Sequence, residues 1–136
     1  MVKIEIEYEG DLRCGAKHGP SGTVLSTDAP VDNQGRGESF SPTDLVATAV
    51  GSCMLTTMGI VAARHDWPLV GARATVVKIM AADPVRRIGS LVVELHLPAA
   101  LDAGARTALE RTALTCPVHK SLAPECDVPV TFHWDL

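Results

Sequence analysis

The chain has 136 residues, a length usual for a single domain, and we expect one domain over residues 1–136. Hydrophobic residues make up 46% and charged residues 21%, so the chain can form a core and is not expected to be disordered. Lys and Arg number 12 against 16 Asp and Glu. This net charge of -4, without a basic run, argues against nucleic acid as the main partner.

The N-terminus does not resemble a secretory signal, because no charged start is followed by an apolar run. We therefore expect a cytoplasmic protein, in which thiols stay reduced unless they are redox-active. No pair of cysteines has C-x-x-C spacing; the four are Cys14, Cys53, Cys116 and Cys126.

Three short strands are predicted before the first helix. Residues 3–8 alternate polar and apolar side chains, which is typical of a strand with one buried face. Residues 12–16 form a second strand after a turn, and residues 22–27 form a weaker third. Pro, Asp, Asn and Gly residues then predict a loop over 29–39.

A long helix is predicted over residues 42–64. Ser41 suits the N-cap, Pro42 suits the first helical position, and Asp44 follows the cap by three residues, as in a capping box. The stretch 45–63 has no charged residue. About 18 such residues can span a bilayer, but Thr, Ser, Ala and Gly dilute the segment and half-buried strands flank it. We expect no membrane insertion and a helix buried on nearly all sides.

A helix that needs cover all round favours a homodimer. In a chain of this length one small sheet covers only one side of the helix, and a second subunit would cover the other. The sequence alone therefore predicts a second copy of the chain as a partner.

The remaining elements complete an α+β fold with mostly antiparallel pairing. Residues 72–81 and 88–97 are strand candidates that pair as a hairpin. Residues 101–115 form an amphipathic helix, and 117–122 form one more helical turn. Residues 128–134 alternate again and close the chain as a strand.

Cys53 lies in the middle of the predicted long helix. A Cys in such a place is ordinarily a small core hydrophobe. Gly51 and Ser52 are small, however, and let another element approach closely. A reactive Cys must ionise near neutral pH, which burial opposes, so Cys53 would need a nearby cation. The candidate cations are Arg13, Arg36 and Lys120.

Cys116 directly precedes a proline, at the expected start of a short helical turn. A thiolate there would face unpaired N–H groups and the positive end of the helix dipole. The alternatives are a simple helix-break residue or part of a zinc site with His119 and Cys126, completed by Cys14 or His18. These residues lack the spacing of a zinc finger, so we expect no metal, and we read Cys14 and Cys126 as structural.

Other catalytic motifs are absent from the sequence. It contains no G-x-S-x-G, no Gly-rich phosphate loop after a strand and no H-E-x-x-H. A hydrolase triad, a nucleotide site and a metalloprotease site therefore have no motif support, and no cofactor is expected.

Two segments together resemble the OsmC/Ohr family of thiol peroxidases. Residues 40–54 read FSPTDLVATAVGSCM, and residues 115–119 read TCPVH. The family pattern is a Ser/Asn-Pro start, a long hydrophobic helix with a Cys about ten residues in, and a second Cys before Pro. The resemblance implies a single OsmC-like domain in an intertwined homodimer. Antiparallel sheets would wrap the long central helices, and two active sites would lie at the subunit interface.

The resemblance also implies a mechanism. Cys53 would attack a hydroperoxide and become a sulfenic acid, and Cys116 would condense with it to a disulfide. A dithiol or other thiol reductant would reopen that bond. The resemblance implies no cofactor.

The family uses an Arg, held by an acid, to stabilise the reactive thiolate. Arg13 is the candidate by its place in the N-terminal strands, with Arg36 in reserve. In the organic hydroperoxide resistance branch the acid directly follows the helix-start proline, where this chain has Thr43. The chain therefore resembles the broader OsmC-like group, and the candidate acids are Glu38 and Asp44.

The predicted function is a thiol-dependent peroxidase acting on organic hydroperoxides, with hydrogen peroxide as a second candidate, in oxidative stress defence. The alternative is a non-catalytic OsmC-like dimer that binds a small apolar or thiol-containing ligand. In the first case an apolar substrate pocket is expected, lined by Leu45, Val46, Val50, Met54 and Met58.

Overall fold

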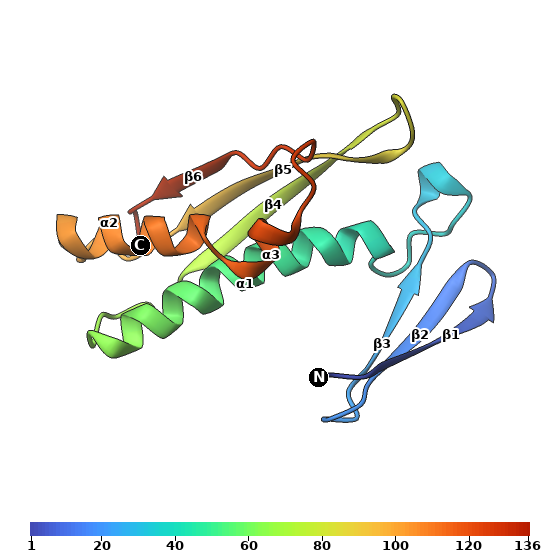
Figure 1. Ribbon diagram of the computed structural model, residues 1–136, viewed down its shortest axis with the longest axis horizontal. Coiled ribbons are helices and arrows are strands. Elements are labelled where there is room, and N and C mark those ends of the chain that lie inside the picture. Colours follow the sequence, from blue (N-terminus) through green and yellow to red (C-terminus); the bar gives the residue numbers. More distant parts are fainter. The chain divides into compact units, whose positions relative to one another are not determined.

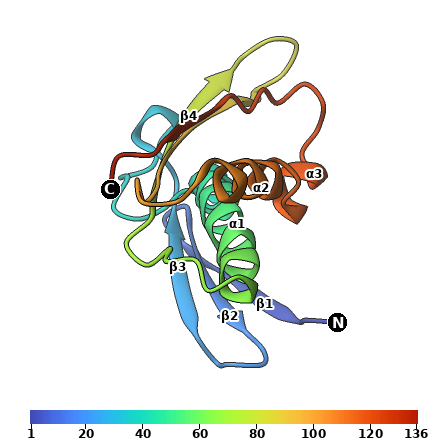
Figure 2. The same cartoon turned by 90° about the vertical axis from the view of Figure 1, so that its left-hand side faces the viewer.

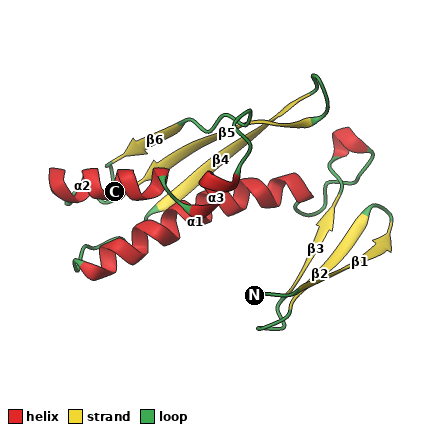
Figure 3. Cartoon of the chain, in the orientation of Figure 1, coloured by secondary structure: helices red, strands yellow, loops and turns green.

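The computed structural model describes residues 1–136 as two compact units, Met1–Val46 and Ala47–Leu136. Figures 1 and 3 show the elements of both units. The first unit contains β1 (Ile4–Gly10), β2 (Arg13–His18), β3 (Val24–Asp28) and the short 3-10 helix η1 (Val31–Asn33). Helix α1 (Pro42–Arg64) begins in the first unit and continues in the second. The second unit further contains β4 (Arg73–Ala81), β5 (Arg87–His96), α2 (Ala103–Leu114), α3 (Pro117–Ser121) and β6 (Val130–His133).

The first unit is a three-stranded antiparallel sheet in the order β1-β2-β3. Ile6 pairs with Ala16, and Ala16 pairs with Leu25, so apolar side chains share one face. The predicted alternation is present, but the prediction that this face of β1 is buried is wrong for the single chain. Ile4, Ile6 and Tyr8 are 58%, 70% and 64% exposed. The unit has no second layer of its own to cover them.

Helix α1 has the predicted bounds. The backbone N–H of Asp44 donates to Ser41 Oγ at 3.1 Å, and the N–H of Ser41 donates to an Asp44 oxygen at 2.9 Å, which is the predicted capping box. The expectation of burial on nearly all sides is wrong for the single chain, because only one face is covered. Ser52 and Ile60 are exposed on the opposite side. The buried residues follow helical spacing: Ala47, Val50, Gly51, Met54, Met58 and Ala62.

By length and composition α1 could also cross a membrane. A core helix of a soluble protein passes the same test, and α1 buries about a third of its most apolar stretch inside this chain. The structure adds the observation that one face of α1 is packed inside this chain.

The second sheet has the order β4-β5-β6. Strands β4 and β5 form the predicted antiparallel hairpin. Strand β6 pairs with β5 in parallel, from Val93 with Val130 to His96 with His133, while the other three strand pairs are antiparallel, so the expected mostly antiparallel pairing is confirmed with β6 as the exception. The reason is the connection: α2 and α3 carry the chain back before β6 begins, as a crossover between parallel strands requires.

Helices α1 and α2 both lie on one face of this second sheet, where the core forms (Figure 2). Alternate residues of β5 point into it, and α1 and α2 fill it from the other side. The fully buried large side chains include Leu91, Val93, Leu95, Met54, Met58 and Leu109. The other face of the sheet carries the remaining side chains of β5, among them Glu94 and His96.

Gly51 marks the closest approach between α1 and β4. A Cβ at Gly51 would lie 3.0 Å from Cγ2 of Val76 and 3.5 Å from Cβ of Ala74. The sequence-based expectation of close packing at Gly51 is therefore confirmed, and it explains a glycine inside a helix, where it costs about 1 kcal/mol relative to alanine.

Candidate functional site

Cys53 is held in the middle of α1 and is half-buried. Its position far from either helix end leaves it without stabilisation from unpaired N–H groups. Its backbone carbonyl accepts a hydrogen bond from the Thr57 hydroxyl at 2.9 Å. The sulfur is therefore fixed by a rigid element, which suits a group that must react in one geometry.

Cys116 is the N-cap of α3 and is only 1% exposed. This position follows from Pro117, which cannot continue α2 but suits the first position of a new helix. Its Sγ accepts a hydrogen bond from the backbone N–H of His119 at 3.4 Å. Cys116 thus has the expected helix-start environment, but in a buried place.

The structure brings Cys53 and Cys116 together. Their side chains are near enough for Cys53 to influence the ionisation of Cys116, and both thiols are free. Burial raises the pKa of Cys116, the His119 N–H opposes this, and the neighbouring Cys53 raises the pKa further. Burial and the neighbouring Cys53 therefore both favour the neutral, proton-bearing thiol of Cys116.

The other two cysteines do not join this pair. Cys126 is half-buried, and burial raises its pKa. Cys14 lies on β2 of the first unit. The zinc alternative built on Cys116, His119 and Cys126 is not assembled: Nδ1 of His119 is 2.8 Å from the carbonyl oxygen of Leu114, and no metal-ligand grouping contains these residues.

Arg13 is held by two carboxylates within the first unit. One guanidinium nitrogen bonds a Glu38 oxygen and lies 3.4 Å from an Asp28 oxygen. Asp28 is 1% exposed and accepts the backbone N–H of Glu38 at 2.9 Å. That N–H, followed by Arg13, lowers the pKa of Asp28, and the same carboxylates raise the pKa of Arg13. Arg13 is thus an arginine fixed by acids, as the resemblance implies.

The two candidate acids have different surroundings. Glu38 bonds Arg13, whereas Asp44 caps α1 through Ser41. Asp28 was missed in the sequence, although it stands opposite Arg13 in the β2–β3 register. Knowledge of the pairing between β2 and β3 would have identified Asp28, because a buried carboxylate needs a partner.

The remaining candidate cations make no such pairs. Arg36 is exposed, forms no ion pair and lies in the loop after η1. Lys120 lies on α3 and is exposed. Arg13 is therefore the candidate that the structure shows anchored.

The expected apolar pocket is not found as predicted. Val50, Met54 and Met58 are fully buried in the core beneath the second sheet. They cannot line an open pocket, because they belong to the packed face of α1. Leu45 and Val46 are half-buried at the end of the first unit.

Comparison with known proteins then assigns the chain. A sequence model of a protein family, described as OsmC-like protein, matches residues 35–131. The chain belongs to the OsmC-like family. The matched range includes Cys53 and Cys116 of this OsmC-like protein, and Arg13 precedes it. Comparison with curated proteins gives no match.

Solved structures resemble the OsmC-like chain over nearly its whole length. A Psychrobacter arcticus 273-4 protein, described as a candidate osmotic stress induced and detoxification response protein, is 46% identical with a TM-score of 0.92, covering 98% of this chain and 96% of that chain. An organic hydroperoxide resistance protein OsmC from Legionella pneumophila is 17% identical with a TM-score of 0.78, covering 98% and 96%. A candidate organic hydroperoxide resistance protein from Vibrio cholerae is 19% identical with a TM-score of 0.76, covering 100% and 92%. The likeness confirms the α+β, OsmC-like fold.

Proposed function

We propose that this OsmC-like protein is a cysteine-based, thiol-dependent peroxidase that reduces organic hydroperoxides. The carrying observation is the pairing of Cys53 with Cys116, in which one thiol is half-buried on a rigid helix and the other is buried and neutral. Support at family level comes from relatives named organic hydroperoxide resistance proteins. Hydrogen peroxide is a second candidate substrate.

In the first step the Cys53 thiolate attacks the distal peroxide oxygen. The O–O bond breaks, Cys53 becomes a sulfenic acid, and the leaving alkoxide takes a proton to become an alcohol. In the second step the sulfur of Cys116 displaces hydroxide from the Cys53 sulfenic acid. The Cys116 proton completes water, and a Cys53–Cys116 disulfide forms. A dithiol or two thiols then reduce this bond and restore both thiols.

We assign Arg13 the role of stabilising the Cys53 thiolate and orienting the peroxide. Asp28 and Glu38 fix its guanidinium, which lowers the entropic cost of holding a long side chain in one place. In this proposal the two carboxylates position the guanidinium of Arg13. The guanidinium itself contacts the substrate.

We further propose that the protein is an intertwined homodimer located in the cytoplasm. The apolar face of the first sheet is exposed at Ile4, Ile6 and Tyr8, and α1 exposes Ile60 at 50%. A second copy would cover these surfaces. The Vibrio cholerae relative is described with captopril bound in one of the active sites, so that protein has more than one active site. Sedimentation at micromolar concentration tests this, and a monomer would contradict it.

The function is tested by peroxide turnover with cumene hydroperoxide and a dithiol. Cys53→Ser is expected to abolish turnover, and Cys116→Ser is expected to block recycling after the first oxidation. Cys126→Ser is the matched control, because this half-buried thiol stands outside the pair, and it is expected to keep full activity. Full activity in Cys53→Ser would show that the proposal is wrong.

A second candidate function is a binding module that holds a small apolar or thiol-containing ligand without turnover. Two observations favour it: Thr43 stands where the organic hydroperoxide resistance branch has its acid, and the Vibrio cholerae relative is described with captopril, a thiol, in an active site. A protein that binds such a thiol tightly, yet consumes no peroxide, would support this candidate over the enzyme.

A further inference from the structure

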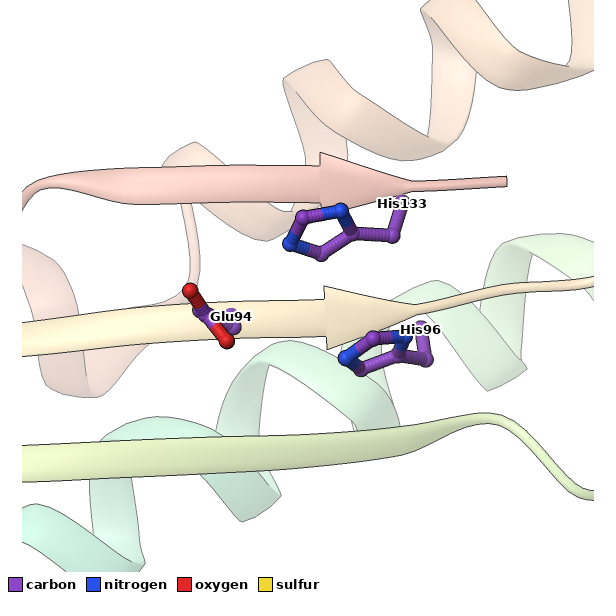
Figure 4. A group of neighbouring side chains, drawn as sticks. All are labelled: Glu94, His96 and His133. Carbon is purple, nitrogen blue, oxygen red and sulfur yellow. The ribbon is translucent and has the colours of Figure 1, made fainter. Parts of the chain in front are cut away.

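A group of metal-ligand side chains lies on the second sheet, on the face opposite the core. Glu94, His96 and His133 offer ligand atoms that all lie within 4.8 Å of one another. Glu94 and His96 are two residues apart on β5, so they share a face, and the parallel register sets His133 of β6 directly beside His96. Figure 4 shows both rings on the same face as Glu94, with their outer nitrogens toward it. The parallel pairing of β6 therefore creates a cluster that no sequence spacing reveals.

Asp135 orients one of the two rings. An Asp135 oxygen lies 2.9 Å from Nδ1 of His96. With the Nδ1 proton committed to the carboxylate, Nε2 of His96 carries the free lone pair. A carboxylate behind a histidine is the usual arrangement around metal-bound imidazole, because it fixes both the tautomer and the ring.

His133 supplies an unsatisfied nitrogen. Its Nε2 is buried and has no hydrogen-bond partner, although its ring stacks on His96 at a centroid distance of 4.6 Å. A buried polar atom without a partner is uncommon and calls for a ligand. Glu94 is exposed, which leaves the cluster open to solvent on one side.

We propose that Glu94, His96 and His133 bind a divalent transition-metal ion, with zinc as the best fit, through two imidazole nitrogens and one carboxylate oxygen. Zinc accepts this donor set at about 2.0–2.2 Å, so adjacent ligands in a tetrahedral site stand about 3.3 Å apart. The ligand atoms of the cluster lie within 4.8 Å of one another, so an ion would draw them inward to reach that spacing. Three protein ligands leave a fourth position for water or an exchangeable ligand.

The charge balance of the cluster is also suitable. Glu94 and Asp135 bring two negative charges, while Arg73, which pairs with His96 across β4 and β5, brings one positive charge. A dication therefore meets a net negative surrounding. Magnesium and calcium are disfavoured, because these ions prefer oxygen ligands and the cluster offers only one carboxylate as direct ligand.

The test is zinc titration by calorimetry on protein without an affinity tag. Because cysteine thiolates also bind zinc, the titration uses the Cys53→Ser/Cys116→Ser variant as its background. One zinc ion per chain is expected to bind. His96→Ala and His133→Ala should each weaken binding more than about 10-fold, and Asp135→Asn should weaken it about 10-fold.

His65→Ala is the matched control, because His65 is also a stacked histidine but lies outside the cluster, against Trp67. It should leave the zinc affinity unchanged, and circular dichroism checks that every variant folds. As a second readout, Co²⁺ should give the visible absorption of a low-coordinate nitrogen and oxygen site, lost in His133→Ala. Absence of binding to the background protein, or equal affinity in the His96 and His65 variants, overturns the proposal.

Discussion

The thiol of Cys116 caps α3 and is near enough to the Cys53 side chain on α1 for Cys53 to influence its ionisation. Two helices that are far apart along the chain thus place two cysteine side chains near each other. Burial and Cys53 both raise the pKa of Cys116, which favours the neutral form of its thiol. In the reaction proposed above, this neutral thiol would supply the proton that the departing hydroxide takes up.

Replacing Cys116 is expected to leave the first oxidation of Cys53 intact. In Cys116→Ser, Cys53 has no thiol to condense with, so its sulfenic acid should accumulate after one equivalent of cumene hydroperoxide. Dimedone labelling followed by mass spectrometry should locate the adduct on Cys53. The wild-type protein, treated identically, should give little adduct. Labelling of Cys126 instead of Cys53 would contradict the assigned roles.

Acid stability is expected to depend on Asp28. The Glu38 N–H and Arg13 hold the pKa of Asp28 below its ordinary value of 3.8 in the folded protein. The ionised carboxylate therefore stabilises the fold fully above its unfolded-state pKa, and this contribution is lost as the pH falls through the folded-state pKa. Urea unfolding below about pH 4 should show a steeper loss of stability in the wild type than in Asp28→Asn. Parallel acid curves for the two proteins would exclude Asp28 as the cause.

The core beneath the second sheet should be sensitive to truncation on one face only. Leu95 is fully buried, so Leu95→Ala should lower the free energy of unfolding by about 2–5 kcal/mol. Val77 lies on the other face of the hairpin and is 54% exposed. Val77→Ala should change the stability by less than about 0.5 kcal/mol. Chemical denaturation measures both, and similar losses would refute the packing described.

Bulk at Gly51 should separate α1 from β4. Gly51→Val adds methyl groups where a Cβ alone would already stand 3.0 Å from Val76, and we expect a loss of about 1–3 kcal/mol. Ser52→Val places the same side chain one residue away on the exposed face and serves as the control. Thermal unfolding compares them, and an unchanged midpoint for Gly51→Val would argue against close packing there.

The sequence was most informative where local rules decide the structure. The cap at Ser41 and the chemistry of proline gave α1 its bounds, and a proline after Cys116 predicted the start of α3. Family resemblance, added to these, singled out both cysteines.

Pairing between strands was beyond the sequence, because residue patterns carry little information about direction or register. The parallel course of β6 depends on how α2 and α3 return the chain, and Asp28 reaches Arg13 only through hairpin register. Apolar character likewise does not separate the wall of a pocket from the core, and the structure places Met54 and Met58 in the core rather than in the expected pocket. The sequence pattern also could not show that the first unit lacks a second layer to cover its apolar face.

The most direct test of the central claim is intact and peptide mass spectrometry of the wild-type protein after one equivalent of cumene hydroperoxide, without reductant. We predict the loss of two hydrogens per chain and a single linked peptide pair joining Cys53 to Cys116, both reversed by a dithiol. Slow, scattered oxygen addition over all four cysteines, with no Cys53–Cys116 link, would contradict the account.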